Sequence, residues 1–328
     1  MRNFFAKVHK ILRSSRRWQV MDAVFQWKAT MMPVFILLAV SMAWPGGTMP
    51  AIAASPAHDN FDDTEAFFRR EKEVQVPIIM YHLVTERDKY IGKYGISPSE
   101  LKSDLKYLKE NDYNTVVMQD LIDFVEKGKR LPKKPVVLTF DDSNASDYKY
   151  LFPLLKEYNM KAVISIIGKA VDQNTEEYAK YPAAKYPNLT WAQVAEMHNN
   201  GAIEVQSHGY NVHGSVGSGK LRRESAKAYH QRLAADLQKL QDRCEEHLGY
   251  KPNTFCYPLG VISKGSRAVL EELGFKASLS CHEGINIITY EDTDCLFRLN
   301  RNNRPSGRSI ERVLEDIYRD AEKKSSKK

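Results

Sequence analysis

The chain has 328 residues, of which 43% are hydrophobic and 27% charged, and its net charge is +7. This composition is ordinary for a globular protein and excludes a collagen-like, low-complexity or fully disordered chain. The positive charge alone would suggest a nucleic acid or another polyanion as partner. However, residues 1–54 hold seven basic residues and one acidic residue, and the last six residues hold four lysines. Because the chain between these ends is slightly acidic, we expect no nucleic-acid partner.

The first 54 residues have the pattern of an export segment. A basic stretch ending at Lys28 is followed by an uncharged apolar run, 31–44, and then by the small residues 51–54 (AIAA). This order is typical of a secretory signal peptide and its cleavage site, whereas a membrane span needs about 20 apolar residues. We therefore expect an exported protein in which residues 1–54 are a signal peptide or, if uncleaved, an N-terminal anchor that contacts the membrane. Residues 55–75 are expected to be a linker.

Between residues 76 and 324, apolar runs of strand type alternate with helical patterns. Strands are expected where short runs of β-branched and aromatic residues are bounded by turn residues: 76–84, 113–118, 135–140, 161–167, 202–206, 254–257, 275–280 and 295–299. Helices are expected where caps, apolar periodicity and terminating glycines coincide: 97–110, 120–127, 147–158, 190–200, 221–247, 264–273 and 306–324. This alternation predicts an α/β protein with a parallel sheet, either open or closed as a barrel.

Four cysteines lie in the part of the chain that would be exported: Cys244, Cys256, Cys281 and Cys295. Disulfides persist in oxidising compartments, and four cysteines allow three pairings. A bond between Cys281 and Cys295 would close a short loop, worth up to about 3 kcal/mol in the chain-entropy model. Buried free thiols are an equally good interpretation. No pair has C-x-x-C spacing, so neither a zinc ribbon nor a thioredoxin-like site is expected.

Three of the expected strands lead into residues that could carry out chemistry. The third runs into Asp141 and Asp142, the fifth leads to His208 and His213, and the first contains His82. In parallel sheets, chemistry gathers at the carboxyl ends of the strands. Taken singly, an Asp pair is more often a helix cap, and a histidine is more often a core or loop residue. Together they favour a catalytic metal site, because two histidines and one carboxylate leave positions open for water and substrate.

The segments that hold these residues resemble polysaccharide deacetylases of the NodB-homology class, carbohydrate esterase family 4. The matching segments are 138–142 (LTFDD), 204–213 (EVQSHGYNVH) and 255–260 (FCYPLG), and the first two together are specific. Residues 80–84 (MYHLV) resemble the subgroup that deacetylates poly-β-1,6-N-acetylglucosamine, in which an early strand supplies a histidine found late in other members. The resemblance covers residues 75–305, the expected catalytic domain from 76 onward. It implies a distorted (β/α) barrel with about seven parallel strands.

The resemblance also implies a role for each residue. Asp141 would be the general base, His82 the general acid, and the backbone N–H of Leu259 a donor to the oxyanion. A divalent metal, most often zinc, would be bound by Asp142, His208 and His213. Residues 306–328 would form a C-terminal helix and basic tail outside the catalytic domain.

Some positions depart from the family pattern or allow two interpretations. Leu259 replaces an aromatic residue that is usual in the family. Many members have an arginine two residues before the motif proline, which orients the general base; Cys256 stands there, so Asp141 lacks an evident partner in the sequence. Tyr210 and Tyr257 could bind substrate by stacking on sugar rings, or they could pack inside the protein.

The sequence therefore predicts an exported, metal-dependent hydrolase that removes N-acetyl groups from an N-acetylglucosamine polymer. The segment around His82 favours an exopolysaccharide over peptidoglycan or chitin. A non-haem iron oxygenase also uses two histidines and one carboxylate, but it would leave Asp141 and His82 without a role. An inactive carbohydrate-binding homologue would not need the full set of polar residues. The sequence does not indicate the oligomeric state.

Overall fold

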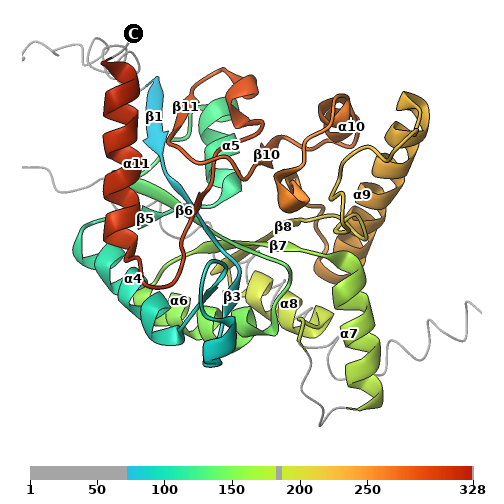
Figure 1. Cartoon of the computed structure of the whole chain (residues 1–328), viewed down its shortest axis with the longest axis horizontal. Coiled ribbons are helices and arrows are strands. Elements are labelled where there is room, and N and C mark those ends of the chain that lie inside the picture. The colour runs from blue at the N-terminus through green and yellow to red at the C-terminus, as the bar shows by residue number, and fades with distance from the viewer. Residues whose placement is uncertain (1–71, 182–186, 327–328) are drawn as a thin grey trace, which may run out of the picture. The chain divides into compact units, whose positions relative to one another are not determined.

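The computed structural model describes residues 72–181 and 187–326 (Figure 1). The expected export segment, nearly all of the expected linker and the last two lysines lie outside the described residues. Within the described ranges, no helix is long and apolar enough to cross a membrane.

The described residues are organised around a parallel sheet of eight strands. Seven of them follow the order β10-β9-β8-β7-β6-β2-β12, and β5 pairs with β6 beside this path. Every pairing in this sheet is parallel, as the alternation of strands and helices predicts. The strands are β2 (Ile78–Tyr81), β5 (Asn114–Thr115), β6 (Pro135–Asp141), β7 (Ala162–Ile166), β8 (Ile203–Ser207), β9 (Thr254–Cys256), β10 (Ala277–Leu279) and β12 (Asn302–Asn303).

One segment, residues 299–303, connects the two edges of this sheet, and we call it the closing segment. Its first residue, Leu299, forms a parallel bridge with Leu279 in β10. Its last two residues are β12, which pairs with β2 at the other edge. Because the same short segment contacts both edges, the sheet curls into a distorted (β/α) barrel, which confirms the fold class expected from the sequence.

Helices surround the sheet (Figure 1). The first of them, α4, begins with the expected capping box: the Ser97 hydroxyl accepts a hydrogen bond from the Glu100 N–H, and the Glu100 carboxylate accepts one from the Ser97 N–H. The helices are α4 (Pro98–Glu110), α5 (Met118–Lys127), α6 (Phe152–Tyr158), α7 (Gly168–Lys180), α8 (Trp191–Asn199), α9 (Ala226–Leu248), α10 (Ser266–Glu272) and α11 (Ile310–Ser325).

The alternation of side chains along β6 determines which face Asp141 occupies. Val136, Leu138 and Phe140 belong to one buried cluster, which includes residues of α4, α6 and α8. Val137 belongs to a second cluster, which includes residues of α5. Because successive side chains of a strand point to opposite faces, Asp141 continues the Val137 face at the carboxyl end of the strand.

The expected strand 76–84 is three short strands in the structure. β1 (Glu73–Val76) pairs antiparallel with β11 (Asn286–Thr289), β2 pairs with β6, and β3 (Leu83–Val84) pairs with β4 (Gly95–Ile96). Pro77 separates β1 from β2, since proline has no N–H to donate to a ladder. The end of the expected linker is therefore part of a strand.

The expected strand 295–299 is wrong. Residues Thr293–Leu296 form a 3₁₀ turn, in which the Asp292 side chain accepts a hydrogen bond from the Asp294 N–H. Only Leu299 of this stretch bridges to the sheet. An aspartate that can bond to the backbone two residues ahead stabilises a turn in place of a ladder, and this local competition is why the apolar run did not become a strand.

All four cysteines are free thiols in the structure. Cys244 and Cys256 are buried, Cys295 is partly exposed and Cys281 is exposed. The bond between Cys281 and Cys295 that the sequence left open is therefore not formed, and the interpretation as buried thiols holds for two of the four.

A buried ion pair joins α4 to the chain just after the closing segment. Arg304 donates from Nε and Nη2 to the two Asp104 oxygens at 2.8 and 2.9 Å, and the Tyr81 hydroxyl donates to Asp104 at 3.0 Å. Both charged side chains are buried. Burial raises the pKa of Asp104, although Arg304 and the hydrogen bond from Tyr81 act in the opposite direction. The carboxylate therefore depends on its partners to stay charged.

We expect Arg304→Met to lower the free energy of unfolding by about 3–5 kcal/mol, because it leaves a buried carboxylate without its cation. Urea unfolding followed by circular dichroism measures this change. The double variant Asp104→Leu/Arg304→Met, which buries no charge, should recover part of the loss. A loss below about 1 kcal/mol in the single variant would contradict the assignment of this pair as a stabilising link, since that is the range of exposed pairs.

Candidate active site and metal centre

The polar residues selected from the sequence come together at the carboxyl ends of β2, β6 and β8. Asp141 is the last residue of β6 and Asp142 follows it. His208 follows β8, and His82 follows β2. His213 reaches the same place from the loop after β8, within 3.3 Å of Asp142. The structure thus groups all five residues, which lie up to 131 positions apart in the sequence.

Asp142 and the two histidines of the β8 loop form a possible metal site. Asp142 Oδ1 lies 3.3 Å from His213 Nε2 and 3.6 Å from His208 Nε2. One ligand atom from each of the three residues lies within 4.8 Å of the others. Asp142 Oδ1 is buried without a satisfying hydrogen bond in the described structure. Two imidazole nitrogens and one carboxylate oxygen fit a catalytic zinc ion or another divalent metal.

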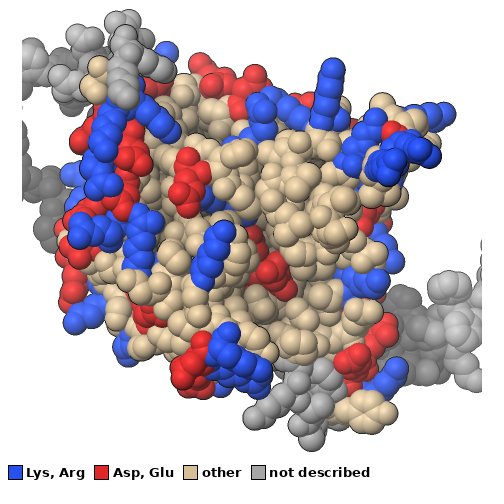
Figure 2. All heavy atoms as spheres, viewed as in Figure 1, with Lys and Arg blue, Asp and Glu red and all other residues tan. Residues whose placement is uncertain are grey.

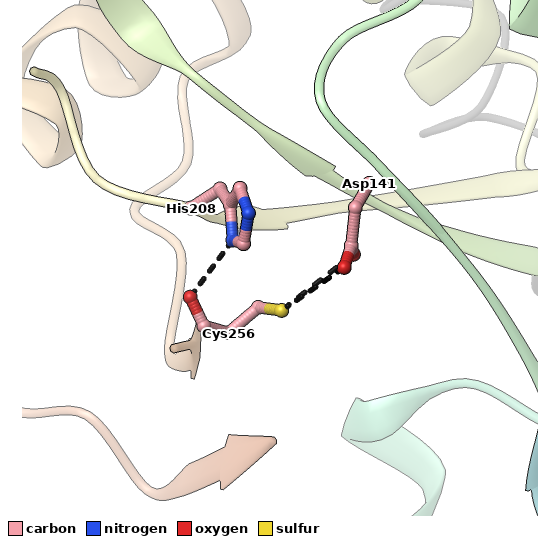
Figure 3. A group of neighbouring side chains, drawn as sticks. All are labelled: Asp141, His208 and Cys256. Carbon is pink, nitrogen blue, oxygen red and sulfur yellow. Dashed lines mark hydrogen bonds between the residues drawn. The ribbon is translucent and has the colours of Figure 1, made fainter. Parts of the chain in front are cut away.

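The tautomer of His208 suits a metal ligand. Its Nδ1 lies 2.9 Å from the backbone carbonyl oxygen of Cys256 (Figure 3). A carbonyl oxygen only accepts hydrogen bonds, so Nδ1 carries the proton and Nε2 presents its lone pair toward Asp142. Burial lowers the pKa of His208, against the opposing effect of Asp141 and Asp142. Burial therefore favours the neutral ring, which is the form that binds metals.

A second group of possible ligands, Asp141, His208 and Cys256, lies beside the first (Figure 3). Its sulfur is poorly suited to a metal, because burial raises the pKa of the Cys256 thiol well above its usual range and only the thiolate is a strong ligand. The thiol lies 3.5 Å from both Asp141 oxygens, where it can donate a weak hydrogen bond. Asp142, His208 and His213 are therefore the better donor set.

Asp141 is held by an arginine that the sequence analysis did not select. Arg301, in the closing segment, is fully buried, and its Nη1 lies 2.9 and 2.8 Å from the two oxygens of Asp141. Its Nε donates to the Ser280 carbonyl oxygen at 2.7 Å. Burial would raise the pKa of Asp141, but Arg301, His208 and His82 hold that pKa well below its usual range. The carboxylate is therefore ionised and fixed in position.

Arg301 takes the place of the base-orienting arginine that is missing at position 256. The sequence has cysteine where many family members carry the arginine that orients the base, and Asp141 therefore lacked an evident partner. In the structure the guanidinium comes instead from the closing segment, 160 residues after Asp141. The run 298–304 (RLNRNNR) was the available signal for such a residue, since it holds three arginines and three asparagines within seven positions.

His82 lies on the other side of Asp141. Its Nε2 is 4.0 Å from Asp141 Oδ2, and 20% of its side chain is exposed. Its Nδ1 is buried without a hydrogen-bond partner in the described structure. The ring packs against Tyr94, with centroids 4.8 Å apart. The His82 imidazole is thus close enough to the Asp141 carboxylate for an electrostatic interaction, and part of the ring remains exposed to solvent.

Leu259 lies in a tight turn, Pro258–Gly260, with a left-handed φ of 57°. The turn is packed closely: a Cβ at Gly260, whose φ is 67°, would lie 2.8 Å from the Cβ of Cys281. The Leu259 side chain is 57% exposed. A fixed turn of this kind can hold a backbone N–H in a constant direction, which an oxyanion donor requires.

The two tyrosines considered for substrate binding have other contacts. Tyr257 is only 1% exposed, and its hydroxyl lies 2.9 Å from the Ser266 hydroxyl. It is a core residue and presents no ring face to a sugar, which corrects the expectation. Tyr210 donates to Asp172 at 3.0 Å, and Lys239 Nζ lies 3.9 Å from its ring centroid. Its ring is therefore already in contact with a neighbouring side chain.

Asp147 is a second buried acid near the site that the sequence analysis placed only in a helix. It begins a π-helical turn, Asp147–Leu151, just before α6. The residue is fully buried, and neither carboxylate oxygen has a hydrogen-bond partner in the described structure. Burial, and then the nearby charges of Asp142 and Asp141, raise its pKa well above the usual range. Burial and the two neighbouring negative charges therefore favour the uncharged form of the Asp147 side chain.

Comparisons with known proteins agree with this geometry. Residues 128–278 match the family model described as polysaccharide deacetylase. The poly-β-1,6-N-acetyl-D-glucosamine N-deacetylase of Escherichia coli K12 is 27% identical over 211 residues, which cover 58% of this chain but only 31% of that relative. The enzyme of the same name from Staphylococcus aureus MSSA476 is 25% identical over 236 residues, 68% of this chain and 78% of that relative.

Solved structures give the same result. A de-N-acetylase from Aggregatibacter actinomycetemcomitans has a TM-score of 0.63 and 27% identity, and the match covers 74% of this chain and 99% of that one. IcaB from Ammonifex degensii has a TM-score of 0.59 with 24% identity, over 74% and 95% of the two chains, and so supports the fold alone. Residues 128–278 match the family model, and the curled parallel sheet brings together the motif residues of this segment. In sequence over this segment and in fold, the chain is therefore similar to polysaccharide deacetylases of the NodB-homology class, carbohydrate esterase family 4.

Proposed function

We propose that this protein is an exported, metal-dependent hydrolase that removes acetyl groups from the N-acetylglucosamine residues of an exopolysaccharide such as poly-β-1,6-N-acetylglucosamine. The observation that carries the proposal is the convergence of the Asp142, His208 and His213 ligand atoms beside an Asp141 carboxylate held by Arg301. The two relatives from Escherichia coli and Staphylococcus aureus, both named as poly-β-1,6-N-acetyl-D-glucosamine N-deacetylases, support this choice of polymer.

The metal site would supply the electrophilic part of the reaction. Asp142, His208 and His213 would hold a divalent metal, most often zinc in this family, which would lower the pKa of water toward neutrality and polarise the acetyl carbonyl. Asp141 would take the proton of the attacking water, and its contact with Arg301, which keeps the carboxylate ionised and fixed, supports this role. A positioned base of this kind contributes about 10²–10⁴-fold to the rate.

The remaining steps belong to His82 and the Leu259 turn. The amide C–N bond breaks, the acetyl group leaves as acetate, and the sugar nitrogen must gain a proton. His82 would give this proton, because an imidazole nitrogen can carry and donate one and its Nε2 lies 4.0 Å from the Asp141 oxygen. The Leu259 N–H would stabilise the oxyanion, an interaction worth about 3–4 kcal/mol where it has been removed in other enzymes.

The charge on the visible face of the protein is compatible with an uncharged polymer. Figure 2 shows acidic atoms near the middle of this face with basic atoms beside them, and a broad area of uncharged side chains around both. A neutral acetylated glycan needs no basic groove, whereas a polyanion would. Peptidoglycan or chitin would meet the same reacting groups, so they are the alternative substrates. A carbohydrate-binding homologue without activity, or an iron oxygenase, would leave the buried pair of Asp141 and Arg301 without a purpose.

Export is proposed from the leader pattern and from the nature of the substrate. An enzyme that acts on a polymer outside the cell must be exported across the membrane. In residues 1–54, a basic stretch, an apolar run and small residues follow one another as in a signal peptide. If that segment is not cleaved, it would anchor the protein at the membrane. Residues 55–75 would then connect the leader to the catalytic domain at 76–305, with 306–328 as the C-terminal helix and tail.

We expect Asp141→Asn to lower acetate release from β-1,6-linked N-acetylglucosamine oligomers by at least about 10²-fold while leaving bound metal unchanged. The reason is that the amide cannot accept the proton of the attacking water, whereas the metal ligands are not altered. Enzymatic acetate assay and metal analysis of the purified variant measure the two quantities. Turnover at the wild-type level would show that Asp141 is not the base.

Removal of the metal should abolish acetate release, and addition of Zn²⁺ should restore it. His213→Ala is expected to lose most of the bound metal, whereas His230→Ala, on α9 and paired with Glu272 at 2.8 Å, is a matched control that keeps it. Cys256→Ser should also keep the metal, which separates the two possible ligand groups. Activity that persists in a fully metal-free protein would contradict the proposed chemistry, and iron-dependent oxygen uptake would favour the oxygenase.

Arg301→Met is expected to reduce acetate release by at least about 10²-fold and to lower stability by about 3–5 kcal/mol, since it leaves the buried Asp141 carboxylate unpaired. Acetate assay and urea unfolding measure the two effects. Arg312→Met, which removes an exposed arginine paired with Glu315, is the control and should alter neither by much. An Arg301→Met variant with wild-type activity would show that the arginine has no part in holding the base.

A further inference from the structure

We propose that Tyr94 is a substrate-positioning residue whose ring stacks on a sugar of the polysaccharide at the rim of the site, next to His82. This inference deepens the proposed function and rests on it. Tyr94 lies in the loop between β3 and β4, and this loop would provide the apolar contact with the glycan.

The ring of Tyr94 lies against a residue of the proposed catalytic set. Its centroid is 4.8 Å from that of the His82 imidazole, and the two planes are inclined by 60°. At the same time 49% of Tyr94 is exposed. The Tyr94 ring therefore contacts His82, the proposed general acid, and the exposed part of the ring is accessible to a ligand. Aromatic side chains provide a large apolar surface at low conformational cost, which suits the C–H faces of pyranose rings.

The backbone around Tyr94 is fixed by hydrogen bonds to the barrel. The Tyr94 carbonyl oxygen accepts from the Leu83 N–H at 3.0 Å, directly after His82 in the chain. The Lys93 carbonyl oxygen accepts from the Asn303 side chain at 2.8 Å, in the closing segment. The backbone at Tyr94 is therefore tied to β3, which begins directly after His82, and to the segment that carries Arg301.

The loop also contains a close approach that only glycine allows. A Cβ at Gly95 would lie 2.0 Å from the Tyr90 carbonyl oxygen. The neighbouring Gly92 carbonyl oxygen accepts from the Ser306 N–H at 2.9 Å. The loop is thus folded tightly back on itself and held by hydrogen bonds at several points. The backbone that carries the Tyr94 ring is therefore positioned before a ligand binds. Such preorganisation reduces the entropy lost on binding.

The Leu259 turn does not offer an equivalent platform. The exposed residues there are aliphatic: Leu259 at 57%, with Val216 and Val261 less exposed. They can contact a sugar but cannot stack on it. Lys93, whose Nζ lies 4.9 Å from the Tyr94 ring centroid, is an exposed side chain that a ligand can displace at small cost. Among the described residues, Tyr94 is therefore the half-exposed aromatic ring that touches the proposed catalytic set.

The test compares three variants on a β-1,6-linked N-acetylglucosamine pentamer. Tyr94→Leu is expected to raise KM about three- to tenfold, the effect of losing one aromatic contact, while kcat changes by less than about twofold. Tyr94→Phe should behave as the wild type, because the ring remains. Tyr90→Leu is the matched control: Tyr90 is an equally exposed tyrosine of the same loop, and its replacement should leave KM unchanged.

A second measurement separates positioning of the sugar from positioning of His82. In zinc-loaded Asp141→Asn protein, pentamer binding by calorimetry should weaken three- to tenfold on adding Tyr94→Leu and should not weaken on adding Tyr90→Leu. Unchanged KM and unchanged binding in Tyr94→Leu would overturn the inference, and so would a fall in kcat with binding intact. If the wild type releases no acetate from the pentamer, the proposed function fails, and the binding measurement still decides whether Tyr94 holds the glycan.

Discussion

The buried ion pair between Asp141 and Arg301 is the constraint on which the rest of the site depends. Removing two charges from water costs several kcal/mol for each ion, and good geometry with further hydrogen bonds is needed to offset that cost. Here Arg301 approaches both carboxylate oxygens and also donates to the Ser280 carbonyl. The same arginine belongs to the segment that joins the two edges of the sheet. The segment that closes the barrel is therefore also the segment that supplies the cation for the proposed base.

The backbone at Asp142 explains how two adjacent aspartates can have different roles. Asp141 ends β6 in extended conformation and faces Arg301, whereas Asp142 has a left-handed φ of 76°. A residue other than glycine rarely adopts that conformation unless its surroundings stabilise it. The change of direction takes the second carboxylate out of the environment of Arg301 and toward His208 and His213. The two negative charges thus face different cations or dipoles, which limits their mutual repulsion.

Local patterns in the sequence predicted the elements that depend on near neighbours. The apolar run of β6 and the capping box at Ser97 are both present, since each is specified by residues within a few positions. The strand expected over 295–299 was wrong because a side chain of the preceding turn competes with the ladder. Tyr257 could be placed at the end of a strand, but whether its ring faced a ligand or the core depends on residues that pack on it from elsewhere in the chain.

The alternation of strands and helices and the parallel sheet follow from the sequence alone. So does the grouping of Asp141, Asp142 and the histidines at strand ends, because the carboxyl ends of parallel strands share one edge. In contrast, the cation that holds Asp141 and the aromatic ring beside His82 became evident only in the folded protein. Arg301 and Tyr94 reach the site through pairings between segments far apart in the chain. Such contacts are set by packing and hydrogen bonding across the whole domain. The polar run 298–304 could mark a segment of interest, but it does not say which residue that segment contacts.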